Sequence, residues 1–434
     1  MAAGSSERMR ADWNERARED AHYYVAFGRR GQDDEEFFAT AGEVATGLRT
    51  ELRRLPRGQN PRARRALEIG CGPGRLMRPL SDCFGEIHGV DVSDAMIELA
   101  REKLKEIPHA HPHHAPGSDL KAFADDSFDF VYSYAVFQHI PDEEVVYRYF
   151  RETRRVLKEG GIARFQINGL PLAAQQYDTW SGVRIAAMDV ARFTRENDFQ
   201  LLALEGRSTQ YMWTTWRKRR AGWIAGLERE RPATTATLRR ITNAFSSEPI
   251  APNRGRFASI SLWIDELPDE CDLNHLTIKI GGEQAFATYI GPPEFDGLRQ
   301  VNAYVPDDLN TGLQPVEVLW LDVPLCSPAT LRIVPPGPPV PRVASVSDGI
   351  NLLSGKRIVT RSVKVVLEEA ERPDQFEATL DGHPITNPEL FCADPRLPLY
   401  EINFPVPEQV QPGERILQMR LGQRRFAPVN LTIA

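Results

Sequence analysis

The sequence predicts an α/β domain followed by two all-β sandwich domains, and three observations support this prediction. From Leu67 onward, short apolar runs alternate with stretches of helical periodicity, which is typical of a parallel sheet built from βαβ units. After Pro252 the helical patterns disappear, and short alternating runs separated by Pro, Gly, Asp and Asn take over. This spacing is typical of β-sandwich modules. The third observation is a repeat inside the β-rich part.

The repeat has an offset of about a hundred residues, the size of one small domain. Its matching segments are Val301–Pro306 with Ile402–Pro407, Gly312 with Gly413, and Leu331–Ile333 with Leu431–Ile433. A Pro-rich stretch, 335–341, lies between the copies and suits a stiff linker. We therefore expect tandem β-sandwich modules over 251–336 and 337–434.

The remaining elements follow in chain order. Residues 7–55 are rich in Glu, Arg and Ala, which favours two or three helices in an N-terminal helical cap over 1–58. In the α/β domain, 59–220, Ser93 is expected to cap a helix, and a charged helical connector is expected over 221–250. Besides the apolar run that begins at Ala66, the expected strands are Glu86–Asp91, Phe128–Ser133, Ile162–Ile167, Leu201–Leu204 and Tyr211–Trp216, and a second helix is expected over about 142–157.

Composition limits the class of protein. The chain has 434 residues, of which 26% are charged and 41% hydrophobic, and a net charge of −7. This balance is typical of a soluble globular protein and gives no global reason to expect nucleic acid or an anionic membrane as partner. Five scattered cysteines favour a reducing compartment. No secretion signal or membrane-spanning run is visible, so we expect a cytoplasmic protein.

The stretch Ala66–Gly74 reads Ala-Leu-Glu-Ile-Gly-Cys-Gly-Pro-Gly, an apolar strand that ends in a turn with three alternate glycines. Glycine tolerates positive φ and lets the backbone approach a ligand closely. A helix can open after Gly74, so the pattern predicts a cradle for a nucleotide cofactor. A P-loop is excluded because no Gly-Lys-Ser/Thr follows. A dinucleotide fold is disfavoured because Arg75 stands where its third glycine belongs.

With Glu68 two residues before the first glycine, this spacing resembles the class I S-adenosylmethionine-dependent methyltransferases, over about residues 60–220. The resemblance implies a Rossmann-like, seven-stranded domain and S-adenosylmethionine as cofactor. Asp91 matches the acid that holds the ribose hydroxyls, and Asp119 the acidic residue near the adenine amino group. The cofactor-binding set implied in this way is Glu68, Gly70, Cys71, Gly72, Gly74, Asp91, Val92, Asp119 and Leu120. Glu68 has the alternative role of ordering the turn.

The loop after the expected strand Phe128–Ser133 is where catalytic residues are sought. His139 is its only residue with an ordinary pKa near neutrality, so it is a candidate acid/base or substrate contact. The alternative is a histidine that orders the loop before Pro141. Tyr134 is a second candidate, as pocket lining. The loop lacks the Asn/Asp-Pro-Pro-Tyr/Phe motif common in methyltransferases that act on amino groups of bases or glutamine, which favours a small-molecule or saccharide-like acceptor.

Two other clusters carry weaker signals. His109, His111, His113 and His114 crowd a Pro-containing segment that we expect to be a loop, and no metal site is predicted there because no thiolate or carboxylate pair completes a coordination sphere. The basic run 217–220 is interpreted as a solvated helix face rather than a nucleic-acid site.

The leading hypothesis is a methyltransferase with an unidentified small-molecule or saccharide-like acceptor and no membrane partner. A cofactor-binding scaffold that works through its β-domains is the alternative from another class. A protein or nucleic-acid methyltransferase is the third reading. The acceptor atom, the use of a base, the role of the β-domains and the oligomeric state stay open at this point.

Overall fold

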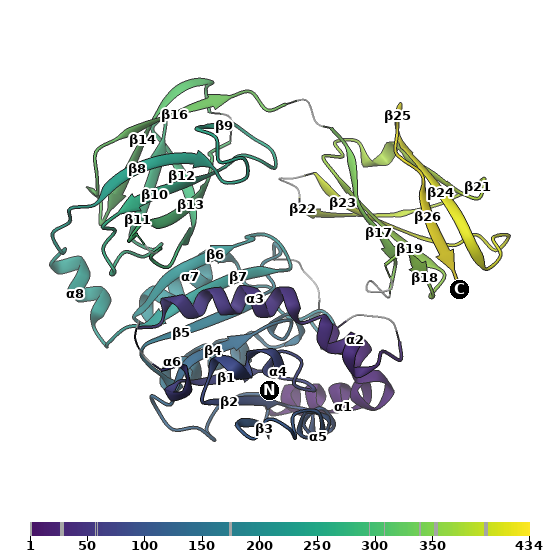
Figure 1. The fold of residues 1–434 in the computed structure, drawn as a ribbon, viewed down its shortest axis with the longest axis horizontal. Helices are drawn as coiled ribbons and strands as arrows, with labels where there is room; N and C mark the ends of the chain where they lie inside the picture. The colour runs from purple at the N-terminus through teal and green to yellow at the C-terminus, as the bar shows by residue number, and fades with distance from the viewer. Residues whose placement is uncertain are drawn as a thin grey trace. The chain divides into compact units, whose positions relative to one another are not determined.

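The computed structural model describes residues 2–26, 30–56, 58, 60–172, 176–294, 296–307, 309–337, 340–350, 355–394 and 398–434. The chain divides into two compact units, Met1–Glu19 with Phe38–Pro335, and Asp20–Phe37 with Pro336–Ala434. The first unit holds an α/β domain and a β-rich region, residues 237–334, that we call module 1. The second unit holds a further β-rich region, residues 342–433, that we call module 2 (Figure 1).

The α/β domain is built on a mixed sheet with the strand order β3-β2-β1-β4-β5-β7-β6. The first five strands in this order are parallel to one another, whereas β7 runs antiparallel to both β5 and β6. The carboxyl ends of the parallel strands therefore meet at one edge of the sheet, where ligands bind in open α/β sheets. The strands are β1 (Arg65–Ile69), β2 (Glu86–Asp91), β3 (Ala110–His114), β4 (Phe128–Ser133), β5 (Leu157–Ile167), β6 (Phe199–Glu205) and β7 (Met212–Lys218).

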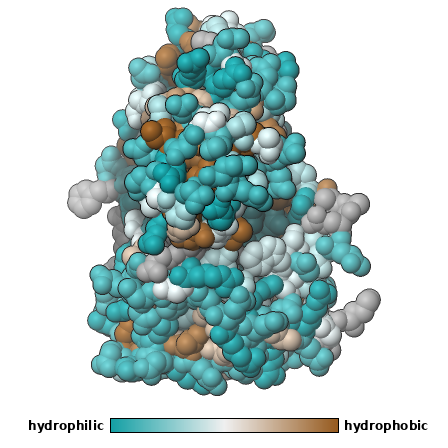
Figure 2. All heavy atoms as spheres, turned by 90° about the vertical axis from the view of Figure 1, so that its right-hand side faces the viewer, coloured by the Kyte–Doolittle hydropathy of each residue, from teal (hydrophilic) through white to brown (hydrophobic). Residues whose placement is uncertain are grey.

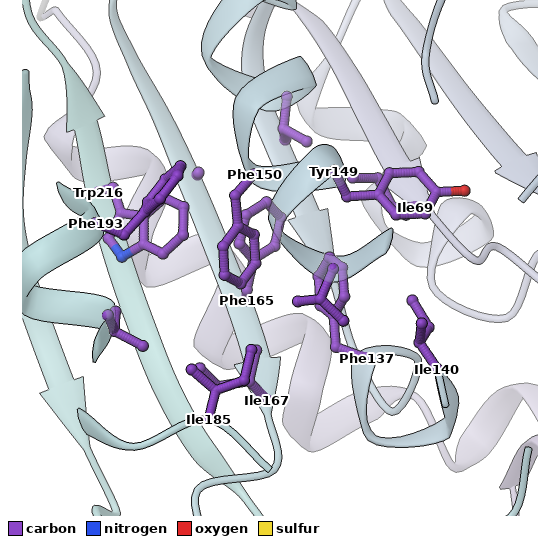
Figure 3. Packing of buried hydrophobic residues seen from close by; sticks show 14 of the residues in the cluster. Ile69, Phe137, Ile140, Tyr149, Phe150, Phe165, Ile167, Ile185, Phe193 and Trp216 are labelled. Atoms are coloured by element: carbon purple, nitrogen blue, oxygen red, sulfur yellow. The ribbon is translucent and has the colours of Figure 1, made fainter. Parts of the chain in front are cut away.

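Helices cover both faces of this sheet, because its strands carry apolar side chains on both faces. On one face, α6 (Glu143–Val156) and α7 (Ala187–Glu196) pack on an aromatic core (Figure 3). On the other, α3 (Gly42–Glu51), α4 (Met77–Leu80) and α5 (Asp94–Lys103) pack on a second core, and α3 crosses in front of β5 and β7 (Figure 1). The first core includes Phe137, Tyr149, Phe150, Phe165, Phe193 and Trp216.

The predicted N-terminal helices are present as α1 (Ala2–Ala26), α2 (Asp34–Ala39) and α3. Helix α1 is interrupted at Asp20, whose φ of −168° and ψ of 88° are not helical. The predicted cap at Ser93 is confirmed, since its hydroxyl accepts a hydrogen bond from the backbone N–H of Met96 at 3.1 Å. Shorter helical turns are η1 (Leu52–Arg54), η2 (Pro61–Ala63), η3 (Ser81–Cys83) and η4 (Phe137–His139).

Module 1 surrounds its own apolar core. Strand β10 pairs with β8 and β13, β13 with β12, and β11 with β12 and β14. Strand β12 also pairs with β6 through Tyr289 and Ala203, which joins module 1 to the sheet of the α/β domain. The strands are β8 (Thr237–Asn243), β9 (Ile250–Pro252), β10 (Ser259–Asp265), β11 (Leu276–Ile280), β12 (Glu283–Ile290), β13 (Arg299–Tyr304), β14 (Gly312–Trp320), β15 (Val323–Pro324) and β16 (Ala329–Val334).

Module 2 repeats this pattern, and the segments of the predicted repeat fall on equivalent strands. Strand β23 corresponds to β13, β24 to β14 and β26 to β16. Gly312 and Gly413 open the equivalent strands with φ of 117° and 116°, values that favour glycine. The elements are β17 (Arg342–Asp348), β18 (Arg357–Ile358), β19 (Ser362–Glu368), η6 (Pro373–Gln375), β20 (Phe376–Leu380), β21 (His383–Pro384), β22 (Glu389–Asp394), β23 (Leu399–Pro405), β24 (Gly413–Leu421), β25 (Arg424–Arg425) and β26 (Val429–Ile433).

Three local predictions were wrong. The connector over 221–250 is helical only in α8 (Trp223–Arg229), because Pro232 and the β-branched residues after it favour strand β8. The basic run begins with the last two residues of β7 and is not a helix face, and Arg217 is buried against Asp269. The histidine-rich segment is the edge strand β3 and not a loop, since an edge strand accommodates Pro112.

Large apolar side chains that are exposed include Leu172, Met188 and Leu313. On the face drawn in Figure 2, hydrophobic residues form small groups among hydrophilic ones. Among the helices of the described ranges, none is long and apolar enough to cross a bilayer.

Candidate functional site

The glycine turn after β1 has the backbone that its sequence predicts. Gly70, Gly72 and Gly74 have φ of 72°, 50° and 84°, in the left-handed region where side chains are disfavoured. A Cβ on Gly70 would lie 2.3 Å from the side chain of Val136. The backbone N–H groups of Gly70 and Cys71 both donate to the carbonyl of Val90, at 2.8 and 3.0 Å. The turn is therefore held close against β2.

Asp91, the last residue of β2, connects this turn to the next helix. Its Oδ2 accepts a hydrogen bond from the N–H of Gly72, and its Oδ1 one from the N–H of Ser93, both at 2.9 Å. Burial raises the pKa of Asp91, although these two backbone donors oppose the shift. A carboxylate has about four acceptor positions, so Asp91 retains capacity for hydroxyl donors of a ligand. Its neighbour Val92 packs on the aromatic core.

Glu68 lies in the buried part of β1, and its Oε2 accepts a hydrogen bond from the Tyr132 hydroxyl at 3.0 Å. Burial raises the pKa of Glu68 to about 8, with the charge of Asp91 acting in the same direction and that of Arg75 opposing it. Glu68 is therefore largely protonated at pH 7. A neutral buried acid of this kind fits the alternative role of ordering the turn.

Arg75, at the position that disfavours a dinucleotide fold, was not among the predicted site residues. Its side chain is only 7% exposed, and burial lowers its pKa. One guanidinium nitrogen donates to the hydroxyl of Thr40 at 3.2 Å, whereas Nε has no hydrogen-bond partner. A buried donor without a partner beside a glycine cradle fits an anionic or polar group of a ligand.

Asp119 and Leu120 lie in the segment after β3. The N–H of Leu120 donates to Glu152 on α6 at 3.0 Å, which fixes the segment, and Leu120 itself is buried. The charges of Asp91 and Asp119 both act on Tyr149, whose pKa is raised first by burial and then by these two carboxylates. Tyr149 thus lies near both predicted acids. No local pattern marks Tyr149 as a site residue, because it follows ordinary helical spacing.

The loop after β4 brings Tyr134 next to Arg75. The Arg75 guanidinium lies 5.4 Å from the centre of the Tyr134 ring, and Trp213 is stacked on Tyr134 at 5.5 Å with an interplanar angle of 6°. Arg164 lies over Trp213 at 4.7 Å. These pairwise contacts link the four side chains, and Tyr134 and Trp213 also pack against the core that α3, α4 and α5 cover.

His139 is buried, and both of its ring nitrogens make hydrogen bonds. Its Nδ1 donates to the carbonyl of Trp180 at 3.1 Å, which leaves Nε2 to accept from the Gln138 amide at 3.2 Å. Burial lowers the pKa of His139 to about 4, and the charge of Arg16 adds to this. The ring is neutral at pH 7 with both nitrogens engaged. This geometry favours the alternative that His139 orders the loop.

The N-terminal segment contacts the same edge. Asn14 Oδ1 accepts hydrogen bonds from the hydroxyl of Ser93 at 2.7 Å and from the N–H of Ala95 at 3.1 Å. Trp13 meets the ring of His139 edge-on at 5.4 Å. Within the part of the chain that the structure describes, no group of three or more His, Cys, Asp or Glu side chains has a metal-binding arrangement.

Residues 67–165 match a family model described as a methyltransferase domain. Phosphoethanolamine N-methyltransferase 2 of Caenorhabditis elegans is 38% identical over 97 residues, which is 22% of this chain and 22% of that protein. Demethylmenaquinone methyltransferase of Staphylococcus haemolyticus is 35% identical over 101 residues, 23% of this chain and 41% of the relative. The chain thus spans less than half the length of the curated relatives it matches.

A likeness in structure accompanies the likeness in sequence. Geranyl diphosphate C-methyltransferase from Streptomyces coelicolor A3(2) has 15% identity and a TM-score of 0.37, over 49% of this chain and 97% of that one. The span that matches the family model, residues 67–165, begins inside β1 and ends inside β5, so it includes the glycine turn and Asp91. By its match to the family model, the segment 67–165 has the sequence of a methyltransferase domain.

Proposed function

We propose that the whole chain is an S-adenosylmethionine-dependent methyltransferase that acts on a small-molecule or saccharide-like acceptor. The observation that carries this proposal is Asp91, which is fixed by two backbone donors and retains acceptor positions for ribose hydroxyls. The positive φ of the glycines and the unpartnered Nε of Arg75 support it, because both leave room and polarity for a cofactor. Asp119 is proposed to bind the adenine amino group.

The proposed chemistry depends mainly on position. S-adenosylmethionine supplies a methyl group that its positive sulfonium has already activated. The protein then has to align the acceptor and exclude water, which accounts for about 7–11 kcal/mol in well-oriented systems. We assign the lining of the acceptor pocket to Tyr134 and the ordering of its loop to His139. The curated relatives named above act on phosphoethanolamine and demethylmenaquinone, which supports a small acceptor for this chain.

The finer architecture belongs to the same proposal. We assign modules 1 and 2 to immunoglobulin-like β-sandwiches, a seven-stranded layout to the methyltransferase domain, and the cytoplasm as location. A cofactor-binding scaffold without turnover is the second candidate, favoured by the sheet that continues from β6 into β12 of module 1.

The test is transfer of a labelled methyl group from S-adenosylmethionine to fractionated cell extract by the full chain. We expect a labelled small molecule or saccharide that is absent with the Asp91→Ala variant. Cofactor binding without any labelled product would support the scaffold. Label recovered only in protein or nucleic acid would overturn the proposed acceptor class.

A further inference from the structure

One face of module 1 differs chemically from the rest of its surface. In strands β10 and β13, residues such as Leu262 and Val301 point into the apolar core. The residues between them, on the opposite face, are Ser261, Trp263, Gln300 and Asn302. Cross-strand pairing aligns Ser261 with Asn302 and Trp263 with Gln300. These four residues therefore form a compact group on the outward face, in which Ser261 is buried and Trp263, Gln300 and Asn302 are partly exposed.

The polar members of this group hold each other in place. The Ser261 hydroxyl donates to Oδ1 of Asn302 at 2.9 Å. The Gln300 amide nitrogen donates both to Ser261 Oγ, at 3.0 Å, and to Asn302 Oδ1, at 2.9 Å. These bonds use the oxygen of Asn302 and the nitrogen of Gln300. In the described part of the chain, the Asn302 amide nitrogen and the Gln300 amide oxygen make no hydrogen bond, so one donor group and one acceptor stand side by side.

Aromatic rings flank the polar group. Trp263 lies next to Gln300, with the guanidinium of Arg240 over its ring at 4.5 Å. Tyr289 lies next to Asn302 on the other side, since these two residues are paired across β12 and β13. The two rows that these residues form across the sheet contain no carboxylate: Arg240, Trp263 and Gln300, and Thr242, Ser261, Asn302 and Tyr289.

Module 2 provides an internal comparison on the same scaffold. Pairing of β19 with β23 places Lys364 and Asn403 where module 1 has Ser261 and Asn302. It places Val366 and Glu401 where module 1 has Trp263 and Gln300. Lys364 and Glu401 there form an ion pair at 2.7 Å. The scaffold therefore does not require the neutral amides and the tryptophan of module 1.

From this arrangement we propose that the outward face of β8, β10, β13 and β12 in module 1 is a binding site for an uncharged oligosaccharide. A sugar presents hydroxyls that both donate and accept, which match the Asn302 nitrogen and the Gln300 oxygen. Its C–H faces suit the apolar surfaces of the Trp263 and Tyr289 rings. The absence of carboxylates from the two rows favours a neutral ligand over a cationic one.

This site lies in the same unit as the methyltransferase domain. The Tyr289 ring has the Arg54 guanidinium at 5.1 Å, and the charge of Arg164 also acts on its phenol. Arg164 in turn lies over Trp213, the neighbour of Tyr134. The charge of Arg164 thus acts on the saccharide site, while its guanidinium contacts the neighbour of Tyr134. Sugar binding does not depend on the proposed methyl transfer, because it can be measured without cofactor.

The test is native gel electrophoresis of the full chain through gels that contain dextran, arabinoxylan, galactomannan or mixed-linkage β-glucan. We expect retardation in at least one gel. Trp263→Ala and Asn302→Ala are each expected to raise the dissociation constant about tenfold or more, as loss of a buried ring contact or hydrogen bond does. Phe245→Ala, which removes another exposed aromatic ring of module 1, is the matched control and should leave retardation unchanged.

A second variant keeps the test independent of folding. The triple change Ser261→Lys, Trp263→Val and Gln300→Glu installs the set that module 2 carries on its own copy of the scaffold. It should melt cooperatively and lose retardation. Migration unaffected by all four polysaccharides would overturn the proposal, as would equal retardation of wild type and triple variant. Retardation only by heparin, abolished by salt, would indicate a basic patch around Arg240 and would also overturn it.

Discussion

The Asp91→Ala variant tests the methyl-donor site most directly. Each hydrogen bond to a charged group contributes about 1.5–3 kcal/mol, and a tenfold change in affinity corresponds to about 1.4 kcal/mol. Loss of one ribose contact should therefore raise the dissociation constant for S-adenosylmethionine about tenfold, and loss of two about 100-fold. The N–H groups of Gly72 and Ser93 also lose their acceptor, which should lower the free energy of unfolding by about 1–3 kcal/mol.

Isothermal titration calorimetry measures the affinity, and thermal unfolding followed by circular dichroism shows that the variant is folded. Asp94→Ala is the matched control, because Asp94 lies three residues further on and pairs with Arg10 at the surface. This control should bind the cofactor as wild type does. An Asp91→Ala variant that is folded and binds within twofold of wild type would refute the ribose assignment.

Three further predictions follow from the pKa shifts. The pKa of Glu68 is raised from about 4.5 to about 8, so the stability that its protonated side chain contributes is present at low pH and is lost as the pH rises from about 5 to 8. Urea unfolding at several pH values should show that Glu68→Gln removes this decline, which amounts to up to about 4 kcal/mol by linkage. Parallel pH curves for the two proteins would contradict the shift. His139 should stay neutral down to about pH 5, seen as unchanged ring ¹⁵N shifts in NMR; a midpoint near 6.5 would contradict its buried hydrogen bonds. Although burial opposes it, the guanidinium groups of Arg217, Arg299 and Arg219 hold the pKa of Asp269 well below its ordinary value of 3.8. Wild type should therefore lose stability as the pH falls below about 4, whereas Asp269→Asn should be less stable at pH 7 and its stability should change less with pH in acid. Equal stability of the two proteins at pH 7 would argue against the cluster.

Much of the methyltransferase domain could be predicted from the sequence. The strands Glu86–Asp91 and Phe128–Ser133 were predicted with their observed bounds, because a strand buried on both faces is a continuous apolar run that ends in polar residues. The histidine-rich edge strand was missed because an edge strand has less apolar sequence. The connector was missed because strand β8 forms only through pairing with β10, which is distant in sequence.

The sequence by itself determined the features that consecutive residues create. The glycine turn needs left-handed backbone at alternate positions, and Asp91 needs only to end a strand beside it, so spacing alone points to the methyl-donor site. The tertiary structure decided whatever depends on partners far along the chain. Burial of Arg75, engagement of both nitrogens of His139, and the alignment of Gln300 with Trp263 on one face all follow from packing and strand register, which no local pattern records.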